Sequence, residues 1–250
     1  MSPHDSRHLI HRWKALARAA GVRLQPLAQA GEDPLFFLKT KALGATGGLY
    51  LSAGVHGDEP AATEALLAWA ESHAAHLREM PLLIFPCLNP WGLARNIRMD
   101  EAGLDLNRSF HLTQHPIIAA VRSATHGHRF AATVHLHEDY DAEGIYLYEL
   151  ARSKTHHGRS ILDAGSLAIA PDPRRAIEGS RCQLGHIRRK VTPEHFADIG
   201  YPEAIWLFAE HADRAYTIET PSEFALPARI AAHLAMLHEI ERRVAPHVGH

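Results

Sequence analysis

Ser52-Ala-Gly-Val-His-Gly-Asp-Glu-Pro60 ends an apolar run and carries a histidine and a glutamate three residues apart. Residues 48–55 are typical of a buried strand, and the proline followed by apolar residues 61–69 indicates the first turn of a helix. His56 and Glu59 therefore lie in a predicted strand-to-helix turn, where open α/β sheets bind ligands. Imidazole nitrogen and carboxylate oxygen both coordinate zinc, so the turn predicts half of a metal site. A solvated turn is the alternative for this pair alone, because the chain has 21 histidines.

Composition narrows the class of protein. The chain has 250 residues, of which 46% are hydrophobic and 22% charged, so residues 1–250 can form one globular domain with a full core. The formal net charge of −2 gives no field that would attract nucleic acid. No stretch approaches about 18 uninterrupted apolar residues, and residues 1–8 lack the apolar core of a signal peptide. We therefore expect a soluble, cytoplasmic protein that has no nucleic-acid partner and no membrane contact.

Alternating strand and helix patterns predict an α/β fold. Strand, helix and strand over residues 48–88 form a predicted parallel crossover unit. We expect a single domain with a mixed, mostly parallel, twisted sheet and helices on both faces. A polar loop covers 89–114, and residues 151–202 show no clear pattern. The predicted helices are 7–20, 60–78, 116–125 and 227–244, and the predicted strands are 34–40, 48–55, 82–88, 130–137, 145–150, 204–208 and 215–219.

Further polar side chains fall at the ends of other predicted strands. The strand 130–137 ends with two histidines, His135 and His137, and the strand 215–219 ends with Glu219. The two histidines lie on one face of their strand, so either can be the third ligand of the predicted metal site.

Several of these features occur in the order found in one known family. The chain resembles the zinc carboxypeptidase superfamily over residues 45–225, in particular short bacterial members near succinylglutamate desuccinylase and aspartoacylase. The resemblance implies the fold of that superfamily and one zinc ion per chain bound by His56, Glu59 and His137, with His135 as the alternative third ligand. It rests on His56-Gly-Asp-Glu59, Asn89-Pro-Trp-Gly92, Arg98, Asp105-Leu-Asn-Arg108, the His135/His137 strand and Glu219.

The same resemblance implies roles for five further residues. Glu219 matches the general base, with a strand-end carboxylate paired to an arginine as the alternative. Arg98 matches the group that stabilises the oxyanion, with a solvated loop charge as the alternative. Arg108, beside Asn107, can bind a substrate carboxylate, because a guanidinium donates two parallel hydrogen bonds to one carboxylate. Tyr201 is a candidate for the hydroxyl that closes over the substrate.

These roles predict a zinc-dependent hydrolase that cleaves an amide bond next to a free carboxylate. Our first interpretation is a metallocarboxypeptidase that acts on short peptides or peptidoglycan fragments. The alternatives are an N-acyl amino-acid deacylase and a non-catalytic zinc-containing relative that binds carboxylates. The substrate is thus a small peptide or an N-acyl amino acid, and the oligomeric state is not predicted. A serine hydrolase is a remote alternative, because the sequence lacks a Gly-x-Ser-x-Gly motif.

The side chain of the substrate is predicted from the region before Glu219. If the family alignment holds, Ala204, Ile205 and Trp206 lie near the wall that contacts the terminal side chain. These residues carry no charge, so we expect a neutral or apolar terminal residue rather than a basic one.

Overall fold

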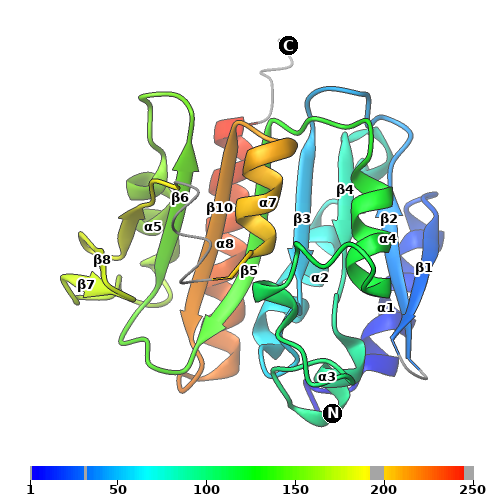
Figure 1. Cartoon of the computed structure of the whole chain (residues 1–250), viewed down its shortest axis with the longest axis horizontal. Coiled ribbons are helices and arrows are strands. Elements are labelled where there is room, and N and C mark those ends of the chain that lie inside the picture. Colours follow the sequence, from blue (N-terminus) through cyan, green and yellow to red (C-terminus); the bar gives the residue numbers. More distant parts are fainter. Residues whose placement is uncertain (1, 31–32, 192–199, 245–250) are drawn as a thin grey trace.

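The computed structural model describes residues 2–30, 33–191 and 200–244 of the chain. Its centre is an eight-stranded sheet with the order β1-β2-β4-β3-β5-β10-β6-β9, and a two-stranded hairpin lies beside it (Figure 1). The sheet contains β1 (Leu24–Ala30), β2 (Asp33–Lys39), β3 (Leu49–Ala53), β4 (Leu82–Phe85), β5 (Ala132–Asp139), β6 (Tyr146–Ala151), β9 (His186–Arg188) and β10 (Arg214–Pro221), and the hairpin contains β7 (Ala176–Ile177) and β8 (Ser180–Arg181).

The four central strands β4, β3, β5 and β10 are parallel neighbours. β1 and β2 extend one side of the sheet in antiparallel pairing, and β6 pairs antiparallel with β10 on the other side and parallel with β9. The parallel register places His135 beside both Ser52 and Thr217, and His137 beside Glu219. The predicted mixed, mostly parallel sheet is confirmed, and its central strands all end at the same edge.

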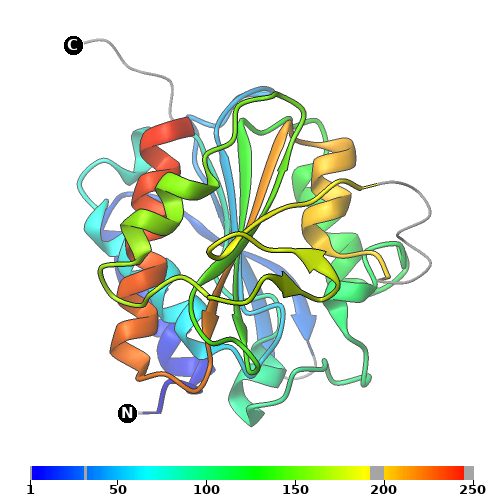
Figure 2. The same cartoon turned by 90° about the vertical axis from the view of Figure 1, so that its left-hand side faces the viewer.

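Helices cover both faces of the sheet, as predicted (Figures 1 and 2). One face carries α1 (Ser6–Ala19), α2 (Pro60–Ser72), α5 (Gly158–Gly165) and α8 (Leu226–Val244), and the other carries α4 (Pro116–Thr125) and α7 (Glu203–Glu210). The short helix α3 (Pro90–Arg95) and the 3₁₀ turns Leu77–Glu79 and Leu106–Arg108 lie in connections. None of the helices in the described part of the chain combines the length and the apolar character needed to cross a membrane.

Each face of the sheet has its own apolar core. In β3, Leu49 and Leu51 pack into the core beneath α2 and α8, whereas Tyr50 packs into the core beneath α4 and α7. This alternation explains the continuous apolar run of the strand, because side chains on both faces are buried. In β5, Val134 and Leu136 belong to the first core. The intervening residues His135 and His137 therefore face the α7 side of the sheet.

One prediction of secondary structure was wrong. Residues 204–208, predicted as a strand, belong to helix α7. A short apolar run fits a buried strand and a buried helix equally well. Here Pro202 precedes the helix, and the side chain of Asn107 accepts a hydrogen bond from the backbone N–H of Glu203 at 3.1 Å. The edge strand β1 was not predicted at all, and it depends on its pairing with β2.

Candidate active site

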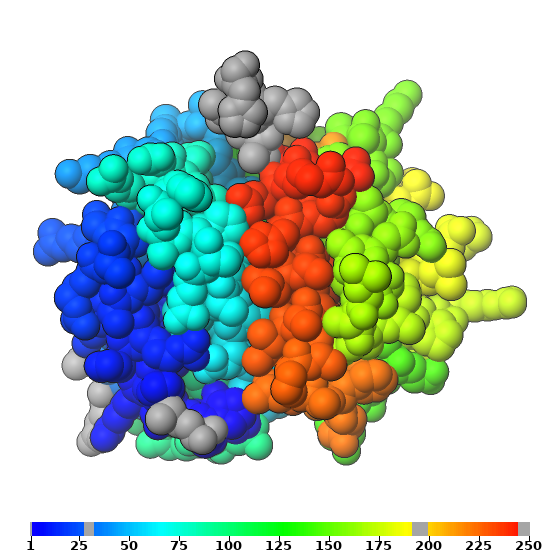
Figure 3. All heavy atoms as spheres, turned by 180° about the vertical axis from the view of Figure 1, so that it is seen from behind, coloured from blue at the N-terminus to red at the C-terminus, as the bar shows by residue number. Residues whose placement is uncertain are grey.

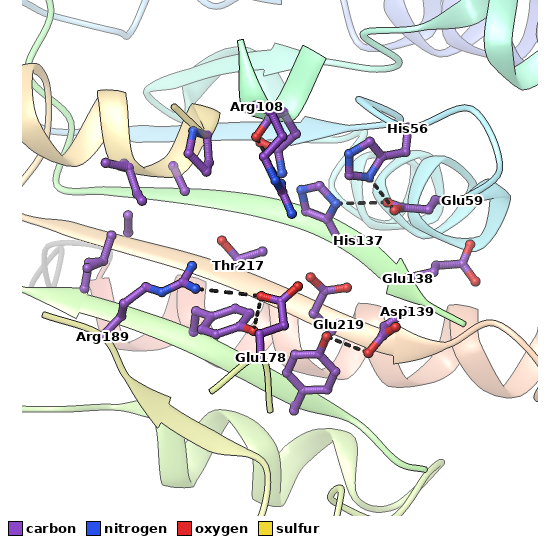
Figure 4. A pocket seen from close by; sticks show the side chains of 18 of the residues that line it. His56, Glu59, Arg108, His137, Glu138, Asp139, Glu178, Arg189, Thr217 and Glu219 are labelled. Atoms are coloured by element: carbon purple, nitrogen blue, oxygen red, sulfur yellow. Dashed lines mark hydrogen bonds and ion pairs between the residues drawn. The ribbon is translucent and has the colours of Figure 1, made fainter. Parts of the chain in front are cut away.

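Three buried side chains converge near the carboxyl ends of β3 and β5 (Figure 4). His56 follows β3, Glu59 immediately precedes α2, and His137 belongs to β5. Their donor atoms all lie within 4.8 Å of one another. Nδ1 of His56 is 2.5 Å from Oε1 of Glu59, and Nδ1 of His137 is 3.0 Å from Oε2 of the same carboxylate. The fold thus brings the His56-Gly-Asp-Glu59 turn and His137 together, although Glu59 and His137 are 78 residues apart in the sequence.

Glycine allows the turn that holds His56 to touch a second turn. A Cβ atom on Gly57 would overlap the backbone of Gly92, so the two turns can approach only without a side chain at position 57. Asn89 shapes the second turn, because its side chain accepts a hydrogen bond from the N–H of Gly92 at 2.9 Å and donates one to the carbonyl of Met99 at 3.0 Å. The Asn89-Pro-Trp-Gly92 motif therefore has a structural role in supporting the metal-site turn.

The three side chains fit a divalent metal ion. Among the described residues, the buried Oε2 of Glu59 has no well-aligned hydrogen-bond donor, although Nδ1 of His137 lies 3.0 Å from it. Nε2 of His56 is 3.2 Å from Oδ1 of Asp105, a carboxylate that only accepts, so this contact directs Nδ1 toward Glu59. A carboxylate behind a ligating histidine is the usual support of such a ligand. Two imidazoles and one carboxylate are a common donor set for zinc and leave a position for water. The buried His-Glu-His group therefore indicates a metal site.

Burial and charge set the ionisation of this group. Burial would raise the pKa of Glu59, but the charges of His56 and His137 outweigh it and hold that pKa far below its ordinary value. Burial lowers the pKa of His137. Burial would also lower the pKa of His56, but Glu59 and Asp105 outweigh this effect and raise that pKa. A buried carboxylate that stays ionised between two imidazoles attracts a cation, which would replace protons on the rings.

His135 has other partners than this group. Its Nδ1 is 3.1 Å from Oε2 of Glu203 and 3.0 Å from the hydroxyl of Ser52, and its Nε2 is 3.1 Å from the hydroxyl of Thr133. Glu203 also accepts hydrogen bonds from the hydroxyls of Tyr50 and Ser52. Burial would raise the pKa of Glu203, but His135 and these donors outweigh it and lower that pKa. His135 thus belongs to a buried polar network between β5 and α7.

Arg98 is held at the site by Asp105. Its Nε and Nη2 atoms are 3.1 Å and 3.0 Å from Oδ2 of Asp105, and its Nη1 is 3.8 Å from Oε1 of Glu59. Burial would lower the pKa of Arg98, but these two carboxylates outweigh it and raise the pKa. Asp105 therefore contacts both His56 and Arg98, a role that the sequence did not predict although Asp105 lies within the motif of residues 105–108.

A pocket of about 330 Å³ opens beside the metal-site residues. This volume is at the lower end of the range for small-molecule sites. Polar and charged groups line the part near the metal site, and apolar groups line the part beneath α7. The lining consists of His56, Glu59, Arg98, Asn107, Arg108, His137, Glu138, Asp139, Tyr146, Tyr148, Leu150, Glu178, Arg189, Pro202, Ala204, Ile205, Ala215, Thr217 and Glu219.

Glu219 lies on β10 beside His137 and faces this pocket (Figure 4). Burial raises the pKa of Glu219 well above its ordinary value, and the nearby carboxylates Glu59, Asp139 and Glu178 act in the same direction. The charge of Arg98 opposes this shift. A raised pKa favours uptake of a proton by the Glu219 carboxylate, which suits a group that accepts and returns protons.

Two arginines enter the pocket from different directions. Arg108 points toward His137 in Figure 4, and in the described part of the chain no carboxylate lies within ion-pair distance of it. Asn107 lines the same wall while its side chain caps α7. Arg189 lies beyond Glu219, with its Nη2 3.7 Å from Oε2 of Glu178 and its guanidinium 4.4 Å from the centre of the Tyr148 ring. Together with Arg98, these two arginines bring three cations to one small cavity.

Two residues predicted near the substrate lie elsewhere. Tyr201 does not line the pocket, and its ring lies 6.4 Å from that of His111. Its backbone N–H donates a hydrogen bond to the carbonyl of Arg108, and its carbonyl accepts one from the N–H of Phe110. Trp206 is fully buried and stacks on Phe110 in the core. The predicted wall is therefore formed by Ala204 and Ile205 without the tryptophan.

Glu138 stabilises the positions of the metal-site residues from the opposite face of β5. Its Oε1 accepts a hydrogen bond from the N–H of Ala61 at 2.6 Å, in the first turn of α2, and its Oε2 pairs with Arg229 at the start of α8. Glu138 follows His137 directly, and Ala61 lies two residues after Glu59. This carboxylate therefore fixes the distance between the strand and the helix that carry the two ligands.

Comparison with known proteins shows what this chain is similar to. Residues 45–151 match the model of the succinylglutamate desuccinylase/aspartoacylase catalytic domain. The structure is similar to that of a candidate metallopeptidase from Shewanella amazonensis SB2B, with a TM-score of 0.84 and 21% identity over 98% of this chain and 95% of that one. The resemblance to the zinc carboxypeptidase superfamily is confirmed. The matched residues include the Asn89 turn and the Asp105-Leu-Asn-Arg108 segment.

Longer proteins share the fold over part of their length. A metallo-carboxypeptidase from Burkholderia cenocepacia has a TM-score of 0.68 and 17% identity, covering 94% of this chain and 67% of that one. Thrombin-activatable fibrinolysis inhibitor has a TM-score of 0.62 and 16% identity, covering 94% of this chain and 75% of that one. At these identities the structures establish a common fold. None of the curated proteins matches the sequence. Family model and fold together indicate a hydrolase of the carboxypeptidase or desuccinylase type.

Proposed function

We propose that the protein is a zinc-dependent hydrolase that cleaves an amide bond next to a free carboxylate, as a metallocarboxypeptidase on short peptides or peptidoglycan fragments. The observation that carries the proposal is that His56, Glu59 and His137 border the same pocket as Glu219 and Arg108. The pocket thereby combines a metal site, a proton-transferring group and an anion-binding group. Hydrolysis of an amide next to a carboxylate needs all three.

The metal-site residues and Glu219 together provide the hydrolytic chemistry. Zinc bound by the three ligands would lower the pKa of water in its open position to about 7. Glu219, on the neighbouring strand, then accepts the proton of the attacking water and returns it to the leaving amine. Arg98, held beside Glu59 by Asp105, stabilises the negative charge that develops on the carbonyl oxygen.

Arg108 and the apolar wall define which substrates fit. A terminal carboxylate can accept two parallel hydrogen bonds from the Arg108 guanidinium, which supports cleavage at the end of a chain rather than within it. Ala204, Ile205 and Leu150 line the part of the pocket below α7. An uncharged wall of this kind accommodates a neutral or apolar terminal side chain and gives a basic one no partner.

A second candidate function is the removal of an acyl group from an N-acyl amino acid. The family model that matches residues 45–151 describes this class of enzyme. Arg189 also favours it, because a second cation in the pocket can bind a second carboxylate of an acidic substrate. In this case Arg108 and Arg189 would bind the two ends of a dicarboxylic molecule.

Substrates that differ only in the free carboxylate test the proposal. We would measure kcat/KM for an acylated dipeptide with a free terminal carboxylate and for its terminal amide, with the parent and with Arg108→Ala, before and after removal of metal by a chelator. We expect the parent to prefer the acid and to lose activity without metal, and Arg108→Ala to lose that preference. If the metal-loaded parent cleaves acid and amide equally well, or Arg108→Ala keeps the preference, Arg108 is not the anchor.

A matched series of N-acyl amino acids separates the two candidate functions. Acetyl and succinyl derivatives of glutamate and alanine should be poor substrates if the protein is a carboxypeptidase. Faster cleavage of the succinyl and glutamate derivatives than of every dipeptide would instead support the deacylase. Absence of turnover with both series in the zinc-loaded parent would contradict both enzymes and favour the non-catalytic carboxylate-binding alternative.

A further inference from the structure

A second cluster of metal-binding side chains lies on the outer surface of the molecule, between α2 and α8. The two helices run side by side on the face of the sheet seen in Figure 3, where α2 is cyan and α8 orange to red. His73 ends α2, and His238 and Glu241 lie one turn apart in the last part of α8. Each of these three residues offers one donor atom, an imidazole nitrogen or a carboxylate oxygen, and these atoms all lie within 4.8 Å of one another.

The donor atoms of the cluster meet around one oxygen. Oε2 of Glu241 is 3.1 Å from Nε2 of His73 and 3.7 Å from Nδ1 of His238. The two imidazole rings are 5.3 Å apart between their centres, with 35° between their planes. Two imidazole nitrogens and one carboxylate oxygen thus face a common point, as they do in the buried site at the other end of α2.

Trp69 orients two of the three side chains. Its carbonyl oxygen is 2.8 Å from Nδ1 of His73 and can only accept, so Nδ1 carries the proton and Nε2 is directed toward the cluster. Its indole N–H donates to Oε2 of Glu241 at 3.2 Å. Hydrogen bonds of this kind behind the ligands hold them in place at metal sites. The cluster is therefore partly organised before any ion binds.

We propose that His73, His238 and Glu241 form a second site for a divalent transition-metal ion, with zinc as the ion that its mixed nitrogen and oxygen donors suit. The site is separate from the candidate active site. Helix α2 has 13 residues, so its two ends lie about 20 Å apart at 1.5 Å per residue. An ion bound here would fasten the end of α2 to α8 and leave the pocket untouched.

Such an ion would stabilise the packing of α2 against α8. Helix α2 begins beside Glu59, and α8 begins near Arg229, which pairs with Glu138 behind the ligand His137. The hydrogen bond of Glu138 to α2 already joins the two helices at that end. A metal ion at the opposite end would reinforce the contact that Trp69 and Glu241 make there. A ligand that binds only the folded state stabilises that state.

Zinc binding by variants of the full-length chain tests this site. The protein would be stripped with a chelator and titrated with Zn²⁺ by calorimetry, with metal content measured after gel filtration. His238→Ala is a suitable variant because the side chain is 43% exposed, so its removal leaves the core unchanged. Glu241→Gln is the second variant, and His76→Ala, which removes an exposed histidine three residues after His73, is the control.

We expect two ions per chain for the parent and for His76→Ala, and one for His238→Ala and Glu241→Gln. His56→Ala should also bind one ion, and His56→Ala with His238→Ala none. Zinc beyond one equivalent should raise the thermal midpoint of the parent but not that of His238→Ala, which should keep its hydrolytic activity. One ion per chain in the parent, or two in both His238→Ala and Glu241→Gln, would overturn the proposal. Loss of the second ion in His76→Ala would do the same.

Discussion

His135 and His137 lie two residues apart on one face of β5, yet they face different carboxylates. Nδ1 of His137 is 3.0 Å from Glu59, at the metal site, and Nδ1 of His135 is 3.1 Å from Glu203, beneath α7. The strand rises by about 3.3 Å per residue, so the two histidines reach positions about 6.6 Å apart along it. One strand therefore contributes both to the metal site and to the network that positions α7.

The two histidines should respond differently to substitution. His137→Ala removes one of three ligands, so we expect loss of the active-site zinc and of activity. His135→Gln leaves the three ligands in place, and the amide can still bond to Ser52, so the zinc should remain. Metal content of both purified variants checks this, in a His238→Ala background so that only one site is counted. Full zinc in His137→Ala with none in His135→Gln would reverse the assignment.

Glu219→Gln should abolish turnover without loss of the fold or the metal. The amide has nearly the shape of the carboxylate but cannot accept a proton, and such groups contribute about 10² to 10⁴ in rate. We therefore expect kcat to fall at least about a hundredfold at unchanged zinc content. Glu178→Gln is the matched control, because Glu178 lines the same pocket but bonds to the hydroxyl of Tyr148 at 2.8 Å. Equal losses in the two variants would argue against a specific role for Glu219.

Arg189→Gln should discriminate between the two candidate enzymes. If the second cation binds a second substrate carboxylate, its removal leaves that carboxylate unpaired, at a cost of about 1.5 to 3 kcal/mol or roughly ten- to a hundredfold in kcat/KM. We expect this loss for acidic substrates and little change for neutral ones. Steady-state kinetics on glutamate and alanine derivatives measures the difference. A uniform loss across both series would show that Arg189 only supports the pocket wall.

Glu149 should make the fold sensitive to acid. This buried carboxylate on β6 accepts hydrogen bonds from the N–H groups of His157 and Gly158 at the start of α5, at 2.8 and 3.1 Å, and Nε2 of His186 is 2.8 Å away. Burial would raise the pKa of Glu149, but these donors outweigh it and lower the pKa. A lowered pKa means that the unfolded chain takes up the proton first as the pH falls. The stabilisation is therefore complete above the unfolded pKa of about 4.3 and is lost below it.

Glu149→Gln should accordingly reduce the free energy of unfolding at pH 7 by about 1 to 3 kcal/mol. The difference between parent and variant should shrink as the pH falls below about 4.3. Urea denaturation at pH 7, 4.5 and 3.5 measures both effects, with the exposed Glu223→Gln as the control. A difference that stays constant over this range would show that the stabilisation does not come from the ionised carboxylate.

The central strands and most of the site were predictable from local signals. The buried strands of residues 48–55 and 130–137 are short apolar runs, and each is followed by or ends in a histidine. Because parallel strands end at one edge, the positions of His56, His137 and Glu219 in the sequence already imply that they meet. Arg98 and Arg108 were found through the resemblance, since loop residues have no periodicity that would place them.

The remaining features depend on contacts between distant segments. Helix α7 resembles a strand in composition, and its start is stabilised by Asn107, which is 96 residues away from Glu203. Glu203 itself is buried only because His135, Ser52 and Tyr50 surround it. Arg189 reaches the pocket from the end of the three-residue strand β9, which is too short to produce a pattern. Because the paired residues are far apart in the sequence, no short segment of it could predict these contacts.

Glu138 also has a consequence for how the protein handles its metal. Its bonds to Ala61 and Arg229 hold β5, α2 and α8 together through protein groups alone. The arrangement of the metal-site residues therefore does not depend on a bound ion. A zinc finger differs, because it unfolds without metal. One divalent ion should replace another by dialysis of the native protein, with no unfolding step. Cobalt introduced in this way would give the buried site a visible absorption spectrum, and thus a direct optical readout of ligand binding in the pocket.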